Sequence, residues 1–305
     1  VSSLINHATN FKKFRRKNLT ISKRVYSYDD CKKLNKWIDI FYVGSDQIWR
    51  PSMAGNRLFR YFLDFADGAK PKISYAASFG SDKWDGTENQ KQAAQDLLKR
   101  FSAISVREDS GVKLCRDEFQ VNAKHVLDPT LLLKQNDYEA IESGKINKRL
   151  AGKKLVAFYL LSDQKGIGKM PQLIRDQLNI NTFNLYGNNK KFAGRPVFQF
   201  GTVGRWLAGI KNSELVVTDS YHCLIFSIIY RKRFICLANE KKGTSRITSL
   251  LKSLDLEGRF ATEKNIDFSE YLKPIDFYQV VKKLKKKKKD SYNFLVSALK
   301  GKNGS

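Results

Sequence analysis

Polar side chains directly follow four short apolar segments of the chain. They occupy residues 44–47, 78–80, 107–108 and 219–222. In open α/β sheets, ligands bind at the carboxyl ends of the strands. Histidine, arginine and carboxylate side chains placed there supply groups for proton transfer and for anion binding. These four segments are therefore the candidate sites of chemistry.

His222 is the most informative of these residues, because it follows an apolar segment and opens a stretch that is apolar nearly all round. Thr218, Asp219 or Ser220 can cap the helix expected there, whose free N–H groups favour an anion such as phosphate. The helix dipole disfavours an imidazolium in the first turn unless an anion compensates. On position alone, a functional histidine and one that only caps or packs are equally open.

Arg107 and Asp46 are the next candidates. The guanidinium of Arg107 can bind a carboxylate or phosphate through two parallel hydrogen bonds, and the alternative is a salt bridge to Glu108 or Asp109. Asp46 can act as a base or bind a sugar hydroxyl, or it can cap the following helix. Residues 201–205 make a weak phosphate loop, because they follow no expected strand and lack the Walker lysine.

Short apolar runs alternate with amphipathic stretches, a pattern typical of parallel strands joined by helices. In the first half we expect a helix capped by Thr87 over residues 87–101, and strands at 38–43, 72–77, 103–106 and 125–127. In the second half we expect strands at 155–161, 182–186, 214–218 and 234–237. Helices are expected at 170–178, 203–210, 222–230 and 245–254, followed by a terminal helical region over 276–299. This alternation predicts an α/β fold.

The polar stretch at residues 135–149 indicates a helix and linker between two domains, and 305 residues fit two domains of typical size. We expect an N-terminal α/β domain over 1–134, a C-terminal α/β domain over 135–265, and a C-terminal helix with a basic tail over 266–305.

The charge balance is strongly basic, with 56 lysines and arginines against 30 acidic residues and a net charge of +26. Such an excess attracts polyanions, anionic lipid or anionic substrates. The basic residues are spread along the chain without a nucleic-acid-binding motif, so we expect no nucleic-acid partner. The densest run is at residues 282–289, from Lys282 to Lys289. It fits either a solvated helix face or a contact with an anionic membrane surface.

The four cysteines and three histidines are widely scattered, without a CxxC pair. We therefore expect reduced thiols, no disulfide framework and no metal site. No apolar run approaches the roughly 20 residues that span a bilayer, and no signal peptide is recognisable. These features predict a cytoplasmic protein, either free or peripheral at the inner face of the membrane.

Six strings, taken in order, resemble the polysaccharide pyruvyl transferase family. They are YVGSDQIW at 42–49, SYAASFG at 74–80, ISVRE at 104–108, VLDPTLLL at 126–133, VTDSYH at 217–222 and SRITSLL at 245–251. Their order and spacing make the combination specific. Two positions depart from the family pattern: Ser220 stands where some members have arginine, and Cys223 stands where a glycine is usual.

The resemblance implies a fold similar to the GT-B glycosyltransferases, with two Rossmann-like domains, over 1–134 and 135–265, facing a cleft. Family members usually begin with a strand, and residues 1–134 are expected to lack this opening strand. It implies phosphoenolpyruvate as the donor, with no further cofactor. The implied acceptor is a sugar unit of a cell-surface polysaccharide or of its lipid-linked precursor. Pyruvate would end as a ketal on two sugar hydroxyls.

The same resemblance suggests roles for the strand-end residues. We expect His222 to act as the general acid or to contact the phosphate, with Ser220 and Tyr221 beside it at the donor. Arg107 is expected to clamp the carboxylate or phosphate. Asp46 is expected to act on the acceptor side, together with Ser45, Gln47 and Ser78.

Two rival hypotheses remain. One is a glycosyltransferase that uses a nucleotide-sugar on the same GT-B architecture. The other is a catalytically inactive relative that binds polyanions through its basic surface.

Overall fold

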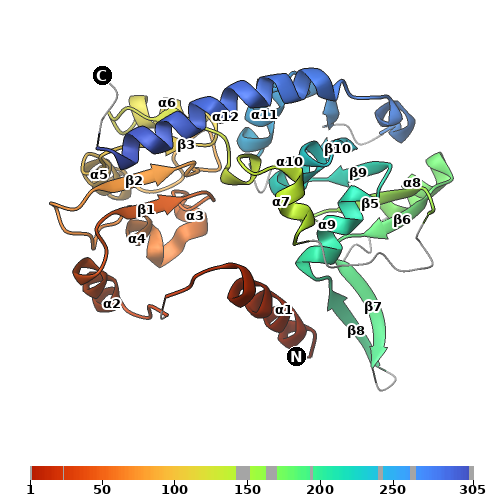
Figure 1. The fold of residues 1–305 in the computed structure, drawn as a ribbon, viewed down its shortest axis with the longest axis horizontal. Coiled ribbons are helices and arrows are strands. Elements are labelled where there is room, and N and C mark those ends of the chain that lie inside the picture. Colours follow the sequence, from red (N-terminus) through yellow and green to blue (C-terminus); the bar gives the residue numbers. More distant parts are fainter. Residues whose placement is uncertain are drawn as a thin grey trace. The chain divides into compact units, whose positions relative to one another are not determined.

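The computed structural model describes residues 2–22, 24–141, 152–162, 170–192, 195–239, 243–261 and 266–301 (Figure 1). The chain divides into two compact units, which we name after the candidate residue that each carries. The Arg107 unit comprises Arg24–Leu132, Glu240–Asp255 and Tyr278–Ser305. The His222 unit comprises Val1–Lys23, Leu133–Asn239 and Leu256–Phe277.

The two units differ from the expected domains in where the two ends of the chain are placed. The first of the three segments of the Arg107 unit ends at Leu132. However, α1 (Ser2–Asn18) lies beside β8 (Arg195–Phe200), so the first residues group with the His222 unit. The terminal helix α12 (Phe277–Leu299) packs on the sheet of the Arg107 unit instead of forming a separate tail.

The Arg107 unit is built on short parallel strands. They are β1 (Phe41–Gly44), β2 (Lys72–Tyr75), β3 (Ser105–Val106) and β4 (Lys124–His125). β1 pairs with β2 and β3 pairs with β4, both in parallel. Single parallel bridges from Ile73 to Ala103 and from Ala77 to Val106 join β2 to β3. The four strands expected in the first half are therefore present, though shorter than their apolar runs.

Each face of this sheet packs against its own hydrophobic cluster. On one face an aromatic core forms around Trp49, whose ring stacks on Phe62 at 5.1 Å. Four helices contribute to that face: α3 (Pro51–Ala54), α4 (Leu58–Tyr61), α5 (Glu88–Leu98) and α6 (Asp109–Asp117). On the other face, Tyr75 packs against Phe294 of α12 at 6.3 Å. As expected, Thr87 caps α5, in a capping box with Gln90.

The His222 unit contains a five-stranded parallel sheet in the order β11-β10-β9-β5-β6. Its strands are β5 (Leu155–Tyr159), β6 (Asn181–Asn184), β9 (Leu215–Thr218), β10 (Arg233–Leu237) and β11 (Phe260–Ala261). On one face, Val156, Phe158 and Val217 pack with Ile174 of α8 (Met170–Leu178). α10 (Tyr221–Ile229) packs beside β9 and β10 and against α9 (Val203–Lys211).

Several elements of the structure carry no clear periodic signal in the sequence. β7 (Gly187–Phe192) and β8 form an antiparallel hairpin, and the apolar alternation typical of a half-buried strand is weak in both. Of the stretch expected as helix and linker at 135–149, α7 (Gln135–Glu139) is helical, and residues 142–149 lie outside the described residues. The Arg107 unit also contains the short helix α2 (Tyr28–Lys33) and the helix α11 (Ser245–Ser253). Among the described residues, no helix is long and apolar enough to cross a membrane.

Candidate functional site

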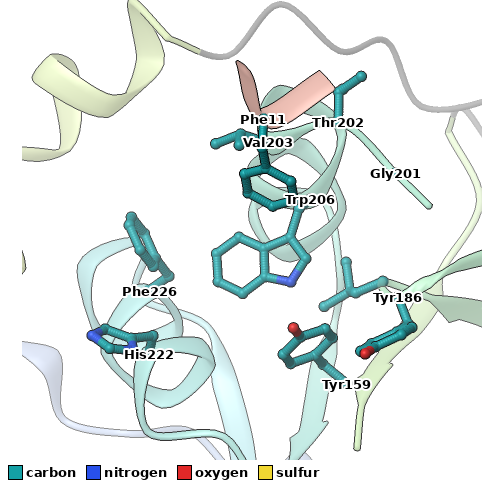
Figure 2. Close-up of a pocket in the computed structure, with 10 residues that line it drawn as sticks. Phe11, Tyr159, Tyr186, Gly201, Thr202, Val203, Trp206, His222 and Phe226 are labelled. Carbon is teal, nitrogen blue, oxygen red and sulfur yellow. The ribbon is translucent and has the colours of Figure 1, made fainter. Parts of the chain in front are cut away.

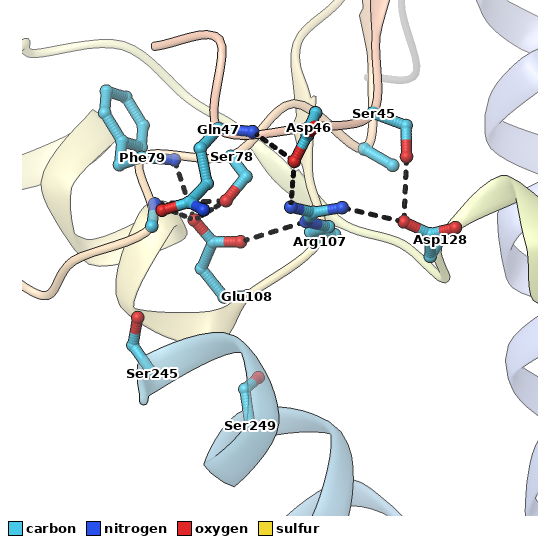
Figure 3. Close-up of polar contacts among 12 residues, drawn as sticks. Ser45, Asp46, Gln47, Ser78, Phe79, Arg107, Glu108, Asp128, Ser245 and Ser249 are labelled. Carbon is cyan, nitrogen blue, oxygen red and sulfur yellow. Dashed lines mark hydrogen bonds and ion pairs between the residues drawn. The ribbon is translucent and has the colours of Figure 1, made fainter. Parts of the chain in front are cut away.

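Arg107 lies at the end of β3 with its side chain completely buried. Its backbone N–H continues the ladder by donating to the carbonyl of Ala77 at 3.1 Å. Its guanidinium donates to Asp128 Oδ2 at 3.0 Å and to Asp46 Oδ1 at 3.1 Å (Figure 3). Its Nε lies 3.9 Å from Glu108 Oε2. Three carboxylates therefore surround one guanidinium.

Glu108 holds the strand-end turn that follows β2. Its Oε1 accepts hydrogen bonds from Ser78 Oγ at 2.9 Å, from Phe79 N at 2.8 Å and from Gly80 N at 3.2 Å (Figure 3). Burial raises the pKa of Glu108, while Arg107 and the hydrogen bonds from Gly80 and Ser78 act in the opposite direction. The glycine is required because Gly80 has φ +67° and a Cβ there would meet the side chain of Gln47.

Asp128 and Asp46 differ in exposure. Asp128 is buried, and its Oδ2 accepts from Ser45 Oγ at 2.8 Å as well as from Arg107. The Asp46 side chain is 65% exposed, and its Oδ1 also accepts from Gln47 N at 2.8 Å. Asp46 is thus the member of this cluster that solvent reaches most readily.

The structure brings Ser45, Asp46, Gln47, Ser78 and Arg107 together in the Arg107 unit, around one ionic network. Two arms of the guanidinium already hold carboxylates, and a bidentate clamp on a substrate anion needs such a pair of parallel donors. The geometry therefore favours a positioning role for this arginine. The salt bridge weighed as the alternative is present, and binding of substrate by Arg107 stays a prediction. Sequence reasoning missed its strongest partner, Asp128, although this residue lies within a family string.

In the His222 unit, three polar side chains organise the turn between β9 and α10. Ser220 is the N-cap of α10, and its Oγ accepts from Cys223 N at 3.5 Å. Thr218 Oγ1 donates to the carbonyl of Tyr159 at 2.7 Å and accepts from Ser220 N at 3.0 Å. Of the three expected cap residues, Ser220 is therefore the one that caps, because Thr218 is engaged with the neighbouring strand.

Asp219, the third of these residues, fastens the segment after β5. Its carboxylate accepts from Leu161 N at 2.5 Å and from Ser162 N at 2.8 Å. It also accepts from Asn239 Nδ2 at 2.7 Å. Because Asp219 is buried, these three donors replace the water that it gives up on folding.

A cavity of about 270 Å³ opens beside the start of α10. Figure 2 shows the indole of Trp206 in its middle, with His222 and Phe226 on one side and Tyr159 and Tyr186 on the other. The remaining lining residues are Phe11, Leu185, Gly201, Thr202 and Val203. The pocket is therefore largely aromatic, with a histidine in its wall.

The aromatic rings of this pocket are packed against one another. Tyr159 stacks on Tyr186 at 5.5 Å and meets Trp206 edge-on at 5.7 Å, and Trp206 meets Phe226 edge-on at 5.3 Å. Trp206 Nε1 is buried and has no hydrogen-bond partner among the described residues. Burial raises the pKa of Tyr159, so its hydroxyl stays protonated at neutral pH. Aromatic rings together with one unsatisfied N–H donor suit a ligand with both apolar and hydroxyl faces.

Sequence reasoning missed these aromatic residues. Tyr186 ends the strand expected at 182–186, and this position was available as a signal. Tyr159 lies inside the strand expected at 155–161, and Trp206 and Phe226 lie inside helices, so these three gave no signal. The expectation that residues 201–205 follow no strand was wrong, because β8 ends at Phe200. Thr202 Oγ1 accepts from Arg205 N at 3.1 Å and so caps α9.

Neither a metal cluster nor a reactive thiol is recognisable in the part of the chain that the structure describes. No group of three or more histidine, cysteine or acidic side chains is placed there to hold a metal ion. Cys223 is completely buried, and burial raises the pKa of its thiol to about 12. The thiol at this unusual position is therefore protonated at neutral pH.

Solved structures with similar folds share little sequence with this chain. A protein from Listeria monocytogenes assigned as a UDP-N-acetylglucosamine 2-epimerase matches with a TM-score of 0.50 and 10% identity, over 87% of this chain and 80% of that chain. The wall teichoic acid polymerase TagF matches with a TM-score of 0.39 and 10% identity, over 98% of this chain and 96% of that chain. The first likeness supports the fold alone, which is mixed α/β and GT-B-like.

The sequence itself gives a more specific result. A search of curated proteins finds no match. The family model of polysaccharide pyruvyl transferase matches residues 4–241, a span that covers most of the chain and includes Asp46, Arg107 and His222. The chain therefore belongs to the polysaccharide pyruvyl transferase family and is a transferase.

Proposed function

We propose that this protein transfers the pyruvate unit of phosphoenolpyruvate to sugar hydroxyls of a cell-surface polysaccharide, or of its precursor, as a ketal. The observation that carries the proposal is the position of His222. In a chain of this family, it lies in the first turn of α10 and lines an aromatic pocket. The acceptor in this proposal is a sugar carrying two neighbouring hydroxyls.

The reaction needs one proton to reach carbon and one phosphate to leave. A sugar hydroxyl adds to the central carbon of phosphoenolpyruvate while the methylene carbon takes up a proton and becomes a methyl group. The bond from the central carbon to the phosphate oxygen then breaks, and the second hydroxyl closes the ketal. The sugar gives up two protons in all, of which one ends on the methyl group and the other on the released phosphate. A group that delivers a proton and steadies the phosphate serves both needs.

His222 is the group we assign to this role. Ser220 and Tyr221 are buried, whereas His222 is half-buried and in the pocket wall. The N-terminus of α10 favours an anion, so phosphate bound there would stabilise the protonated imidazole next to it. The hydroxyl of Ser220 serves as the helix cap, which makes it a positioning residue in this proposal.

The aromatic pocket is our candidate for the acceptor sugar. The rings of Tyr159 and Trp206 provide apolar faces, and their hydroxyl and N–H groups are donors for sugar hydroxyls. The unsatisfied Trp206 Nε1 supports this assignment, because a buried donor without a partner costs about 1–3 kcal/mol that a ligand oxygen would offset.

The Arg107 cluster offers a second, separate candidate for the acceptor side through its exposed member. Asp46 is our acceptor-side candidate, together with Ser45 and Gln47, which are half-buried. Ser78 is completely buried and donates to Glu108, so it holds the turn and does not meet the sugar. Arg107 then acts by fixing the carboxylate of Asp46.

The test is phosphate release from phosphoenolpyruvate in the presence of a pyruvate-free glycan acceptor. We expect His222→Ala to lower turnover by about a hundredfold or more, as the loss of a general acid does. His125→Ala is the matched control, since His125 lies outside the pocket and contacts the carbonyl of Arg107. Unchanged turnover in His222→Ala would refute the assignment.

The rival hypotheses give other outcomes. Saturable binding of a nucleotide-sugar, without phosphate release from phosphoenolpyruvate, supports a glycosyltransferase. Steeply salt-dependent binding to anionic polymer that His222→Ala leaves unchanged supports an inactive polyanion-binding relative. Because phosphoenolpyruvate is a cytoplasmic metabolite, our proposal places the reaction in the cytoplasm.

A further inference from the structure

α12 carries the most concentrated charge of the protein. Within Phe277–Leu299 there are seven lysines and a single acidic residue, Asp290. An isolated run of lysines is usually a solvated helix face, so charge alone does not define a binding surface. The distribution of apolar side chains around the helix is more informative.

One face of α12 is fixed to the Arg107 unit. Its buried residues are Val280, Leu284, Ser291 and Ala298. Their spacing places them on one side of the helix. Ser291 Oγ accepts from Leu127 N at 3.0 Å, and Phe294 packs on Tyr75. The orientation of the helix about its own axis is therefore set, and the opposite face is directed to solvent.

The exposed surface of α12 is not uniformly polar, as the surface of a solvated helix would be. Five large apolar residues on α12 are between 41% and 75% exposed: Tyr278, Val281, Tyr292, Val296 and Leu299. At about 100° per residue they fall within a sector roughly 60° wide that borders the buried face, and the Tyr292 hydroxyl donates to the carbonyl of Leu132 at 3.2 Å. The exposed lysines Lys282, Lys285 and Lys289 lie within or beside the same sector. We call these eight residues the α12 face.

We propose that the α12 face binds an anionic membrane surface, with the helix lying in the plane of the interface. The lysines would meet lipid phosphates, and the apolar side chains would enter the boundary between headgroups and acyl chains. This proposal does not depend on the proposed reaction. It gives a protein of net charge +26 a defined point of attachment.

Charge complementarity favours a bilayer over two other occupants. A second copy of this helix would bring lysine against lysine, with only Asp290 to offset the repulsion. A nucleic acid would engage the lysines through its phosphates but would leave the exposed apolar surface of these side chains in water. An interfacial helix, in contrast, combines basic residues with apolar ones that insert.

The first experiment measures co-sedimentation of the full chain with lipid vesicles. We expect binding to phosphatidylcholine vesicles that contain about 30 mol% phosphatidylserine, and none to phosphatidylcholine alone. The combined variant Lys282→Gln, Lys285→Gln, Lys289→Gln should weaken binding roughly a hundredfold, at about fivefold per lysine. The control variant Lys36→Gln, Lys83→Gln, Lys113→Gln removes the same charge from exposed sites elsewhere in the same unit. Equal losses in both variants would overturn the proposal.

The second experiment separates membrane insertion from attraction to any polyanion. Val296→Ser with Leu299→Ser should lower vesicle binding by about tenfold, since less apolar area enters the interface. Retention on a heparin column should not change. Vesicle binding equal to that of the unmodified chain would refute an interfacial helix and favour a polyanion partner. Circular dichroism of each variant verifies that α12 remains folded.

Discussion

The ends of the two parallel sheets carry polar groups that are used in different ways. At the end of β3, Arg107 is enclosed by carboxylates, and Glu108 and Asp128 find donors within the same cluster. At the end of β9, Asp219 is equally satisfied, but the neighbouring pocket contains His222 and the unpartnered Trp206 Nε1. The first edge is thus closed around its own ionic network, although Glu108 Oε2 accepts no hydrogen bond among the described residues, whereas the second lies beside an aromatic pocket with one buried, unpartnered N–H donor. Substitutions at each edge can break or sharpen this comparison.

The largest effect is expected at Arg107. Arg107→Met removes the guanidinium and leaves the carboxylates of Glu108 and Asp128 buried without their cation. We expect the free energy of unfolding to fall by about 3–5 kcal/mol, as when one partner of a buried ion pair is removed. Urea unfolding followed by circular dichroism measures this loss.

A matched control in the same unit is Arg116→Met, because Arg116 pairs with Asp117 at 2.6 Å and both side chains are more than half exposed. Loss of that pair should leave the free energy of unfolding nearly unchanged, because water screens exposed ion pairs. The comparison breaks if Arg107→Met retains its stability and instead raises only the KM for phosphoenolpyruvate, since Arg107 would then bind substrate.

The second effect concerns the rigid part of the His222 edge. Asp219→Ala leaves Leu161 N, Ser162 N and Asn239 Nδ2 without their acceptor. We expect a loss of about 2–3 kcal/mol in the free energy of unfolding, because buried donors are orphaned. Asp267→Ala is the control: Asp267 caps an exposed turn through Ser269, so water can replace it. Equal losses of unfolding free energy in the two variants would show that the buried hydrogen bonds of Asp219 stabilise the fold no more than those of an exposed cap.

The third effect separates a tryptophan that has a hydrogen-bond partner from one that has none. Trp49 Nε1 donates to the carbonyl of Tyr61 at 3.0 Å inside the aromatic core, while Trp206 Nε1 has no partner among the described residues. Trp206→Phe should change the free energy of unfolding by no more than about 0.5 kcal/mol and weaken acceptor binding by about 1 kcal/mol, or fivefold in KM. Trp49→Phe should instead lower stability by about 1–3 kcal/mol. A stability loss in Trp206→Phe as large as in Trp49→Phe would contradict an unsatisfied donor.

The comparison also explains which features the sequence predicts. Apolar periodicity locates β1, β2, β5 and β9 and the helix α10, because each is decided by neighbouring residues. Asp46, Arg107 and His222 are likewise recognisable as strand-end residues. The partners of Arg107 are not, since Asp46 lies 61 residues and Asp128 21 residues away along the chain. Such pairings depend on which strands become neighbours.

The aromatic pocket is harder still to predict. It takes Phe11 from α1, tyrosines from two strand ends, and rings from inside α9 and α10. An aromatic residue in a helix is more often part of a core than of a pocket. Only the packed helices reveal that Trp206 and Phe226 leave a cavity between them and the strand ends.

The smallest effect is expected at Cys223, which lies next to His222 but has its side chain buried beneath α10. Because burial raises the pKa of this thiol to about 12, it is protonated at pH 8, and iodoacetamide should label it at least roughly a thousandfold more slowly in native than in urea-unfolded protein. Because the thiol ionises more readily in the unfolded chain than in the folded protein, its contribution to the free energy of unfolding depends on pH. That contribution is fully present below about pH 8.5, the pKa of an unfolded thiol, and is lost as the pH rises toward 12. The turnover of Cys223→Ala in pyruvyl transfer should stay within about twofold of that of the unmodified chain. Rapid native labelling of Cys223, with Cys115 still protected, would show that the His222 edge opens where the Arg107 edge does not.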